Sequence, residues 1–281
     1  MNILIGLIPA LCWGLYPICL TKMGGSYFQQ LFGTSVGILI FASFVQLIFK
    51  YSISTTDFFY CTLSQEYVGV LARRDKFGVL KKVSVSAVMP ITTAFQTIGN
   101  SLIGGWLFKE WSGVLDNLLG LGALIIILLG VFIANGFVKI QHKDLVAYFI
   151  LFLTTVGYWG YSGFPHYCSA GGLMGFFPQA MGMMIGSSVI YLIGHKKAIG
   201  DDRLGIRNIS SGILFGGAAS TYLVSLGLNG LVNAFALTQL NVVIATMTAM
   251  LILKEKPKKQ IMSTLIGLII LILGVFMMVK I

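Results

Sequence analysis

A series of apolar runs of transmembrane length constrains the fold of this chain more than any other feature. A helix that spans a bilayer needs about 20 mostly apolar residues. Such runs lie near 2–20, 27–49, 84–108, 113–138, 144–165, 173–194, 209–228, 231–253 and 262–280, with a weaker one near 57–80. Short connections make neighbouring helices antiparallel. The sequence therefore predicts an all-α integral membrane protein of about ten transmembrane helices.

Composition supports a chain without a separate water-soluble domain. Of the 281 residues, 57% are hydrophobic and only 10% are charged, whereas soluble domains carry about 25% charged residues. The net charge is +10, but the basic residues lie in short clusters between apolar runs. This pattern is typical of cytoplasmic loops of membrane proteins, and we do not expect nucleic acid to be a partner.

The basic residues also bear on orientation. With 57–80 counted as the third helix, only Lys50, Lys109 and Lys280 of the 19 Lys and Arg residues follow even-numbered helices. Because positive loops face the cytoplasm, this distribution places the odd-numbered connections inside and both termini outside.

The cysteines and the first apolar run point to ordinary membrane helices. Cys12, Cys19, Cys61 and Cys168 fall in or beside apolar stretches without CxxC spacing, and buried cysteine usually behaves as a small apolar residue. Neither a disulfide nor a metal site is expected. The run at 3–20 lacks a basic leading region, so we interpret it as a retained helix and not a signal peptide.

Short motifs recur in the same order in the two halves of the chain. Trp13-Gly14 recurs as Trp159-Gly160, Gln30-x-x-Gly33-x-x-x-Gly37 as Gln179-x-x-Gly182-x-x-x-Gly186, and Lys109-Glu110 as Lys254-Glu255. A unit of five helices repeated once must insert in opposite orientations. We therefore predict inverted repeats at 1–138 and 144–281, an arrangement typical of transporters with a binding site near the membrane midplane. The repeated glycines are expected to allow close helix contact.

Several stretches resemble one transporter family. They are Pro9-Ala10-Leu11-Cys12-Trp13-Gly14, Gln29-Gln30-x-x-Gly33-Thr34, Met89-Pro90-Ile91-Thr92-Thr93-x-x-Gln96, Lys109-Glu110-Trp111-Ser112 and Gln239-x-x-Val242-Val243-Ile244-Ala245-Thr246. Together they resemble the glucose/ribose porter family of the drug/metabolite transporter superfamily. The resemblance implies ten helices and proton-coupled uptake of a monosaccharide across a bacterial plasma membrane. It also implies cytoplasmic termini, which disagrees with the charge distribution.

One stretch departs from the family pattern. Residues 65–82 include Arg73-Arg74-Asp75-Lys76, where each central charge in a membrane helix costs about 2.5–3.5 kcal/mol. Codons that encode this stretch, read one base earlier, permit the expected family motif. We hypothesise a compensated frameshift near 65–82, from a sequencing error or a decayed gene; the alternative is a divergent loop. The printed sequence predicts a disrupted third helix and impaired transport.

A sugar site needs amide partners and aromatic platforms in an apolar cavity. The candidate substrate-binding amides are Gln30, Gln96, Asn100, Gln179, Gln239 and Asn241, and the candidate aromatic residues are Trp13, Tyr16, Tyr158 and Trp159. The alternative interpretation is hydrogen bonding between helices for the amides and packing or interface anchoring for the aromatics.

Proton coupling requires a group that titrates inside the protein, and acidic residues are scarce. Glu110 and Asp116 are the candidates, although both lie near helix ends: the alternative for Glu110 is a solvated helix end, and the alternative for Asp116 is an ordinary first-turn acid. Proton symport therefore rests on the family resemblance and not on a central acid.

Other function classes fit the sequence less well. His142, His166 and His195 are scattered, so we expect neither an enzyme nor a cofactor, and no Walker A pattern indicates an ATP-driven pump. A drug or metabolite exporter of the same superfamily and a non-transporting membrane subunit remain as alternatives. The sequence leaves open which sugar is carried, which ion is coupled and whether a homodimer forms.

Overall fold

The fold is built from helices. A computed structural model describes residues 2–65, 85–135, 145–163, 166, 172–194, 203–248, 250–251 and 258–281. The helices are α1 (Ile3–Met23), α2 (Tyr27–Phe49), α3 (Thr55–Gln65), α5 (Val85–Leu102), η2 (Ile103–Leu107), α6 (Val114–Asn135), α7 (Leu145–Gly163), η5 (Gly172–Gly175), α8 (Phe176–Gly194), α9 (Arg203–Thr238), α10 (Leu240–Thr248) and α11 (Lys258–Val279). No strand occurs in these ranges, which confirms the all-α prediction.

Within the described ranges, six stretches are long and apolar enough to cross a membrane. They are Ile3–Met23, Phe28–Phe49, Val114–Ala134, Gly172–Leu192, Gly205–Thr248 and Gln260–Val279, and α7 adds the shorter apolar stretch Tyr148–Gly160. The chain is therefore a multi-pass membrane protein. Of the weak run near 57–80, the structure describes only the part in α3, so the disruption and frameshift expected near 65–82 lie outside the described residues beyond Gln65.

The surface and the interior have the polarity of a membrane protein. Large apolar side chains such as Leu4 and Val114 are 76% and 80% exposed. Polar side chains such as Thr34, Asn100 and Ser187 are fully buried. An apolar exterior suits contact with lipid, whereas buried polar groups face other helices.

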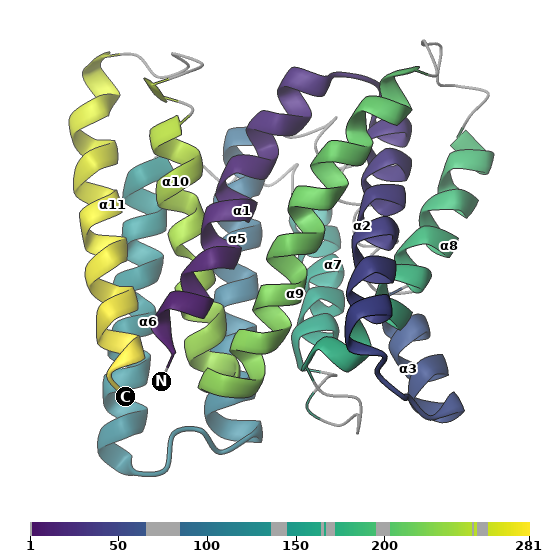
Figure 1. Cartoon of the computed structure of the whole chain (residues 1–281). Helices are drawn as coiled ribbons and strands as arrows, with labels where there is room; N and C mark the ends of the chain where they lie inside the picture. The colour runs from purple at the N-terminus through teal and green to yellow at the C-terminus, as the bar shows by residue number, and fades with distance from the viewer. Residues whose placement is uncertain are drawn as a thin grey trace.

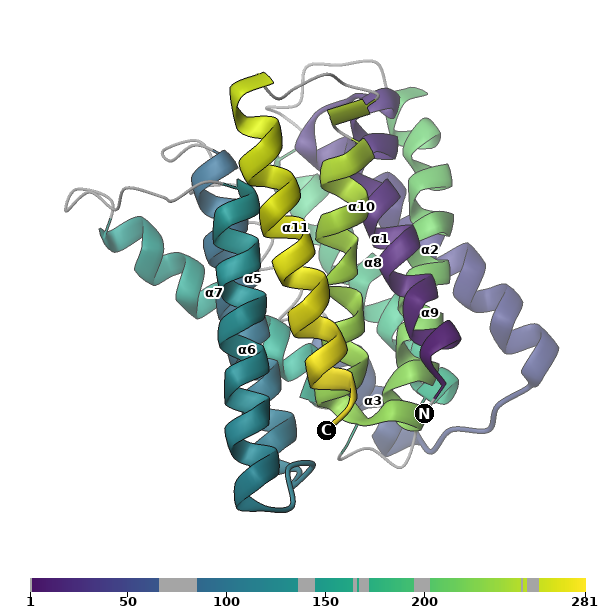
Figure 2. The same cartoon turned by 90° about the vertical axis from the view of Figure 1, so that its left-hand side faces the viewer.

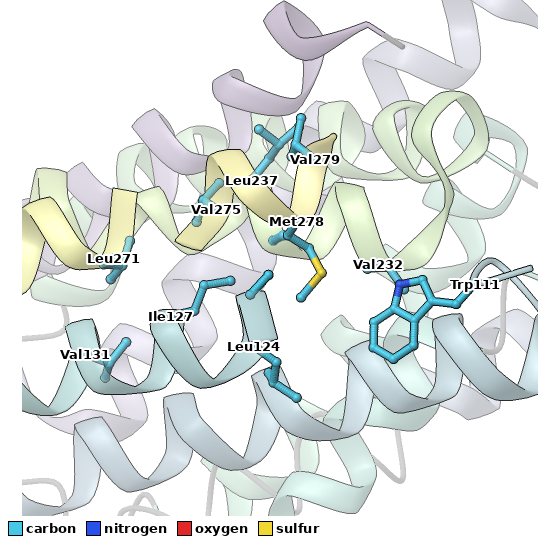
Figure 3. Packing of buried hydrophobic residues seen from close by; sticks show 12 residues of the cluster. Trp111, Leu124, Ile127, Val131, Val232, Leu237, Leu271, Val275, Met278 and Val279 are labelled. Atoms are coloured by element: carbon cyan, nitrogen blue, oxygen red, sulfur yellow. The ribbon is translucent and has the colours of Figure 1, made fainter. Parts of the chain in front are cut away.

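In one view the helices fall into two flanks with four helices between them. Helices α6, α10 and α11 lie on one side and α2, α3 and α8 on the other, with α1, α5, α7 and α9 between them (Figure 1). The turned view places α7 at the edge of the molecule, on the opposite side from α1 (Figure 2). On the first flank, α6 and α11 run side by side (Figure 2). Their facing side chains form an apolar cluster that Trp111 and Val232 close at one end (Figure 3).

Local sequence explains where α1 and α2 end. Gly24 follows α1 with φ 69°, a left-handed conformation that glycine adopts readily. Ser26 then caps α2: its Oγ accepts the Gln29 N–H and its own N–H donates to Gln29 Oε1 at 2.8 Å. Lys50 closes α2 in the left-handed region, with its N–H donating to Gln46 O.

Glycines let the backbones of α2 and α9 touch. A Cβ at Gly33 would meet Gly205 O, and a Cβ at Gly37 would meet Ile209 O. From the other side, a Cβ at Gly212 would meet Thr34 O. The expected close contact through Gly33 and Gly37 is confirmed, while the corresponding expectation for Gly182 and Gly186 stays a prediction.

Glycines also let the backbones of α6 and α11 approach each other closely. A Cβ at Gly130 would meet the Leu271 backbone, and a Cβ at Gly267 would meet the Ala134 backbone. Small residues at helix interfaces are favourable in membranes because they let backbones approach closely. One glycine-mediated pair, α6 with α11, therefore lies within a flank, and the other joins α2 to α9.

We expect Gly37→Ala to destabilise the protein by about 1–3 kcal/mol, because the added methyl group has to push α2 away from α9. The measurement is the free energy of unfolding, or the midpoint of thermal denaturation, in detergent. Gly217→Ala on α9 is the matched control, since nothing lies within 4 Å of a Cβ at that position. Equal stability of the two variants would contradict the close contact.

Candidate functional site

An aromatic group lies where α1 packs on α9. The ring of Trp13 lies 5.9 Å from Phe215 and 5.5 Å from Tyr222, and the ring of Tyr16 lies 5.2 Å edge-on from Phe215. The Tyr16 hydroxyl is 3.4 Å from Thr34 Oγ1 on α2. Two of the four predicted aromatic residues therefore lie together.

Trp13 carries a spare hydrogen-bond donor. Its Nε1 atom is buried and has no hydrogen-bond partner among the described residues. Buried indole N–H groups usually find a partner, and an unsatisfied one costs free energy. A ligand hydroxyl is one group that would satisfy it.

Asn100 on α5 is a second unsatisfied group. Its side chain is fully buried, and within the described part of the chain neither Nδ2 nor Oδ1 has a hydrogen-bond partner. Gln96 lies one turn earlier on α5 and is half-buried. Buried amides without partners are uncommon, so Asn100 is the clearest candidate for a polar ligand contact.

Trp159 fastens α7 to α5. Its Nε1 donates to Phe95 O at 3.0 Å, and its ring lies against Gly99, where a Cβ would collide with it. Phe152 packs edge-on at 5.7 Å. Trp159 therefore has a structural bond that its counterpart Trp13 lacks. Tyr158, the neighbouring candidate, is half-buried.

The helix path is interrupted at Gln239, between α9 and α10. Gln239 N–H donates to Ala236 O, and its buried side chain lies 3.5 Å from Phe235 O and 3.4 Å from Thr238 Oγ1. Asn241 follows on α10, half-buried, and a Cβ at Gly14 would lie 3.1 Å from its carbonyl oxygen. This contact places Asn241 beside α1.

Helix α5 also meets the second half of α9. A Cβ at Gly104 would lie 2.7 Å from Val232 Cγ2, and Ile98 packs against the cluster that contains Val232, Ala236 and Leu237. Helices α1, α5 and α10, which carry the aromatic residues Trp13 and Tyr16 and the candidate amides, therefore each contact α9.

The described hydrogen bonds of Gln30 lie outside the aromatic group. Gln30 is in the first turn of α2, where Nε2 is 3.5 Å from Leu20 O and 3.3 Å from Gly24 O. Gln179 is buried in the first turn of α8. The described contacts of Gln30 thus belong to the α1–α2 turn.

Of the two candidate acids, Glu110 lies between η2 and α6, and Asp116 lies in the first turn of α6. Asp116 accepts hydrogen bonds from Ser112 N and Oγ at 3.2 and 2.8 Å, which is a local cap of α6. Glu110 accepts from the backbone N–H groups of Leu231 and Val232. Neither carboxylate is among the contacts of the aromatic group.

Phe215 and Tyr222 complete the aromatic group, and sequence reasoning did not single them out. They lie two turns apart on α9 and belong to none of the repeated motifs, so only their residue type distinguished them. A search of the described residues finds no cluster of His, Cys, Asp or Glu that would bind a metal ion.

Comparisons with known proteins agree over the whole length. The sequence model of a family described as "Sugar transport protein" matches residues 4–281. A Lactobacillus helveticus protein named "Putative sugar uptake protein" is 35% identical, over 98% of this chain and 99% of its own. A Latilactobacillus sakei protein named "Putative ribose uptake protein RbsU" is 36% identical, over 98% and 96%.

One solved structure shares the fold. It is described only as "Crystal structure of protein", and it superposes with a TM-score of 0.80 over 98% of this chain and 96% of its own. Its sequence is 13% identical, so the likeness concerns the fold alone.

We expect Trp159→Phe to lower the free energy of unfolding by about 0.5–1.5 kcal/mol more than Trp13→Phe does. Both changes remove an indole ring, but only Trp159 loses a hydrogen bond, the one to Phe95 O. Unfolding titrations of the two variants in detergent measure the difference. A larger loss for Trp13→Phe would show that its N–H is satisfied within the protein.

Proposed function

The chain belongs to the sugar transport protein family, and we propose that it is a secondary transporter that takes up a monosaccharide of the glucose or ribose type, coupled to protons. The names of relatives at 35% and 36% identity support sugar as the substrate class. The buried, unsatisfied Asn100 amide on α5 is the observation that carries the site. Transport of this kind needs no catalytic group and no cofactor.

We propose further that residues 1–138 and 144–281 are two inverted five-helix repeats. The contacts support this because they occur in equivalent pairs under the repeat. Helix α2 packs on α9 as α8 packs on α3, and α1 packs on α10 as α7 packs on α5. Helices α6 and α11, which end the two halves, pack on each other, as do α2 and α8. In this arrangement the binding site lies between the halves.

The sugar in this proposal lies between α1, α5 and α10. Trp13 and Tyr16 offer aromatic faces to the apolar side of the ring, as Tyr158 and Trp159 do from α7. The amides of Gln96, Asn100, Gln239 and Asn241 offer donors and acceptors to its hydroxyl groups. Gln30 and Gln179 are assigned to the ends of this region and not to direct contact.

Proton coupling is the part of the proposal that depends on the family. Glu110 and Asp116 are the candidate groups, and both already accept hydrogen bonds at one end of the bundle. A proton that binds there would act on the opening of that end and not on the sugar directly.

We expect purified protein in proteoliposomes to accumulate a labelled monosaccharide when a pH gradient is imposed. Glucose, ribose and rhamnose are offered separately, with and without the gradient, and protein-free vesicles are the control. Accumulation that a protonophore abolishes supports proton-coupled uptake. Downhill uptake alone would contradict proton coupling, and no uptake of any of the three sugars would contradict the proposed substrate class.

We expect Asn100→Ala to weaken sugar binding by about 1–3 kcal/mol, or roughly 5- to 150-fold in the dissociation constant, without lowering the stability of the protein. An amide that lacks partners in the protein is not needed to hold the fold. Equilibrium binding and thermal denaturation measure the two quantities.

Asn117→Ala is the matched control for Asn100→Ala. Asn117 is bonded to Trp106 Nε1 at 2.7 Å and to Gly113 O at 2.7 Å at the start of α6. Asn117→Ala removes these two hydrogen bonds, so it is expected to lower the stability of the protein and to leave sugar affinity unchanged. Lower stability with unchanged sugar affinity in Asn100→Ala, together with weaker sugar binding in Asn117→Ala, would show that Asn100 is not part of the site.

A further inference from the structure

Helix α9 is broken at one glycine. Gly230 has φ 76° and ψ 172°, so the helix ends before it and restarts after it. The first N–H groups of a helix lack acceptors within the helix. Those of Leu231 and Val232 therefore need outside partners, and Gly230 has no side chain to provide one.

The partner comes from a distant segment. Glu110 Oε1 accepts the Leu231 N–H at 2.6 Å, and Glu110 Oε2 accepts the Val232 N–H at 2.8 Å. A carboxylate is the favoured group at a helix N-terminus, where the backbone dipoles leave partial positive charge. A Cβ at residue 230 would lie only 2.9 Å from the Glu110 carboxyl carbon, so glycine also makes room for this cap.

The backbone around Glu110 is firmly held. Its N–H donates to Gly104 O at 3.1 Å, and the next N–H, of Trp111, donates to Gly105 O at 3.2 Å. The Trp111 ring is buried, with Gly105 and Gly120 leaving it room. The backbone segment that carries the Glu110 carboxylate is thus held against η2 and α6.

The beginning of α1 reaches the same turn from another side. Asn2 N–H donates to Asn229 Oδ1 at 2.8 Å, and Asn229 Nδ2 donates to Ser225 Oγ at 2.9 Å and to Asn2 O at 3.3 Å. The N-terminus lies beside this end of α9 (Figure 1). Three segments that are far apart in sequence are therefore joined at one end of the bundle.

We propose that Glu110 is a latch that holds this end of the transporter closed. It is a positioning residue: it fixes the helix restart at Leu231, and that segment leads directly to Gln239 and Asn241. Breaking the two hydrogen bonds frees the second half of α9 to move against α5 and α1, which opens a path from this end to the centre. The idea of a path rests on the proposed transport function, whereas the closure itself is testable without sugar.

Accessibility of a buried cysteine tests the closure. Cys12, Cys19, Cys61 and Cys168 are replaced by Ala, and Ala234, which is fully buried on α9, is changed to Cys. The rate of labelling by a membrane-impermeant thiol reagent is then measured in right-side-out and inside-out vesicles. Glu110→Gln is expected to raise the rate about tenfold from one side only, and Glu110→Asp is expected to have a smaller effect.

Asp57→Asn is the control. It also removes one carboxylate, but Asp57 lies at the start of α3, where its Oδ2 accepts the Ser54 hydroxyl at 2.8 Å. Its labelling rate is expected to equal that of the parent. Equal rates for Glu110→Gln and the parent, or the same increase with Asp57→Asn, would overturn the latch.

A crosslink that holds this end closed is the second test, and it does not depend on the folding of Glu110 variants. Asn2→Cys and Asn229→Cys, in the same background, are joined by a short bifunctional thiol reagent that contains a reducible bond. Sugar uptake is expected to stop on crosslinking and to return on reduction. Uptake at the uncrosslinked rate would show that this end need not open. A parent protein that carries no sugar would count against the proposed function, and the labelling experiment would still decide the latch.

Discussion

Backbone contact through glycine is the interaction on which the arrangement of helices depends. Lipid tails are as apolar as leucine, so helices in a bilayer gain little from burying apolar side chains against one another and rely on close packing instead. Gly37 with Gly212 lets α2 meet α9, and Gly130 with Gly267 lets α6 meet α11. Glycine also lets α1 approach α10, at Gly14, and lets η2 approach the second half of α9, at Gly104.

The helical path from α9 to α10 is broken at Gly230 and at Gln239, and each break needs its own compensation. In hydrocarbon, backbone groups freed from a helix have to be satisfied by protein. At Gln239 the compensation is local, because Val242 N–H donates to Gln239 O and the side chain turns back on the preceding residues. At Gly230 it is remote and comes from Glu110. The first break is self-contained, whereas the second ties two halves of the chain together.

The all-α fold and several helices were predictable from the sequence because apolar length is a local property, whereas the described residues show six membrane-spanning stretches and leave the number of ten a prediction. The runs at 2–20 and 27–49 correspond to Ile3–Met23 and Tyr27–Phe49, and the gap between 228 and 231 falls at Gly230. The roles of particular side chains were not predictable. Gln30 bonds to the α1–α2 turn only because that turn folds back on it. Repeated Trp-Gly motifs suggested equivalent tryptophans, yet only Trp159 has a backbone carbonyl within reach among its described contacts.

The cap at Gly230 has an evolutionary consequence. Glu110 and Leu231 lie 121 positions apart, but a change at one end of this contact alters what is tolerated at the other. A side chain at 230 would have to enter the space that the carboxylate occupies, and a shorter acid at 110 would leave the amides of the restarted helix bare. Substitutions at these sites are therefore expected to accumulate jointly as lineages diverge, so that the loop and the turn are inherited as a single unit.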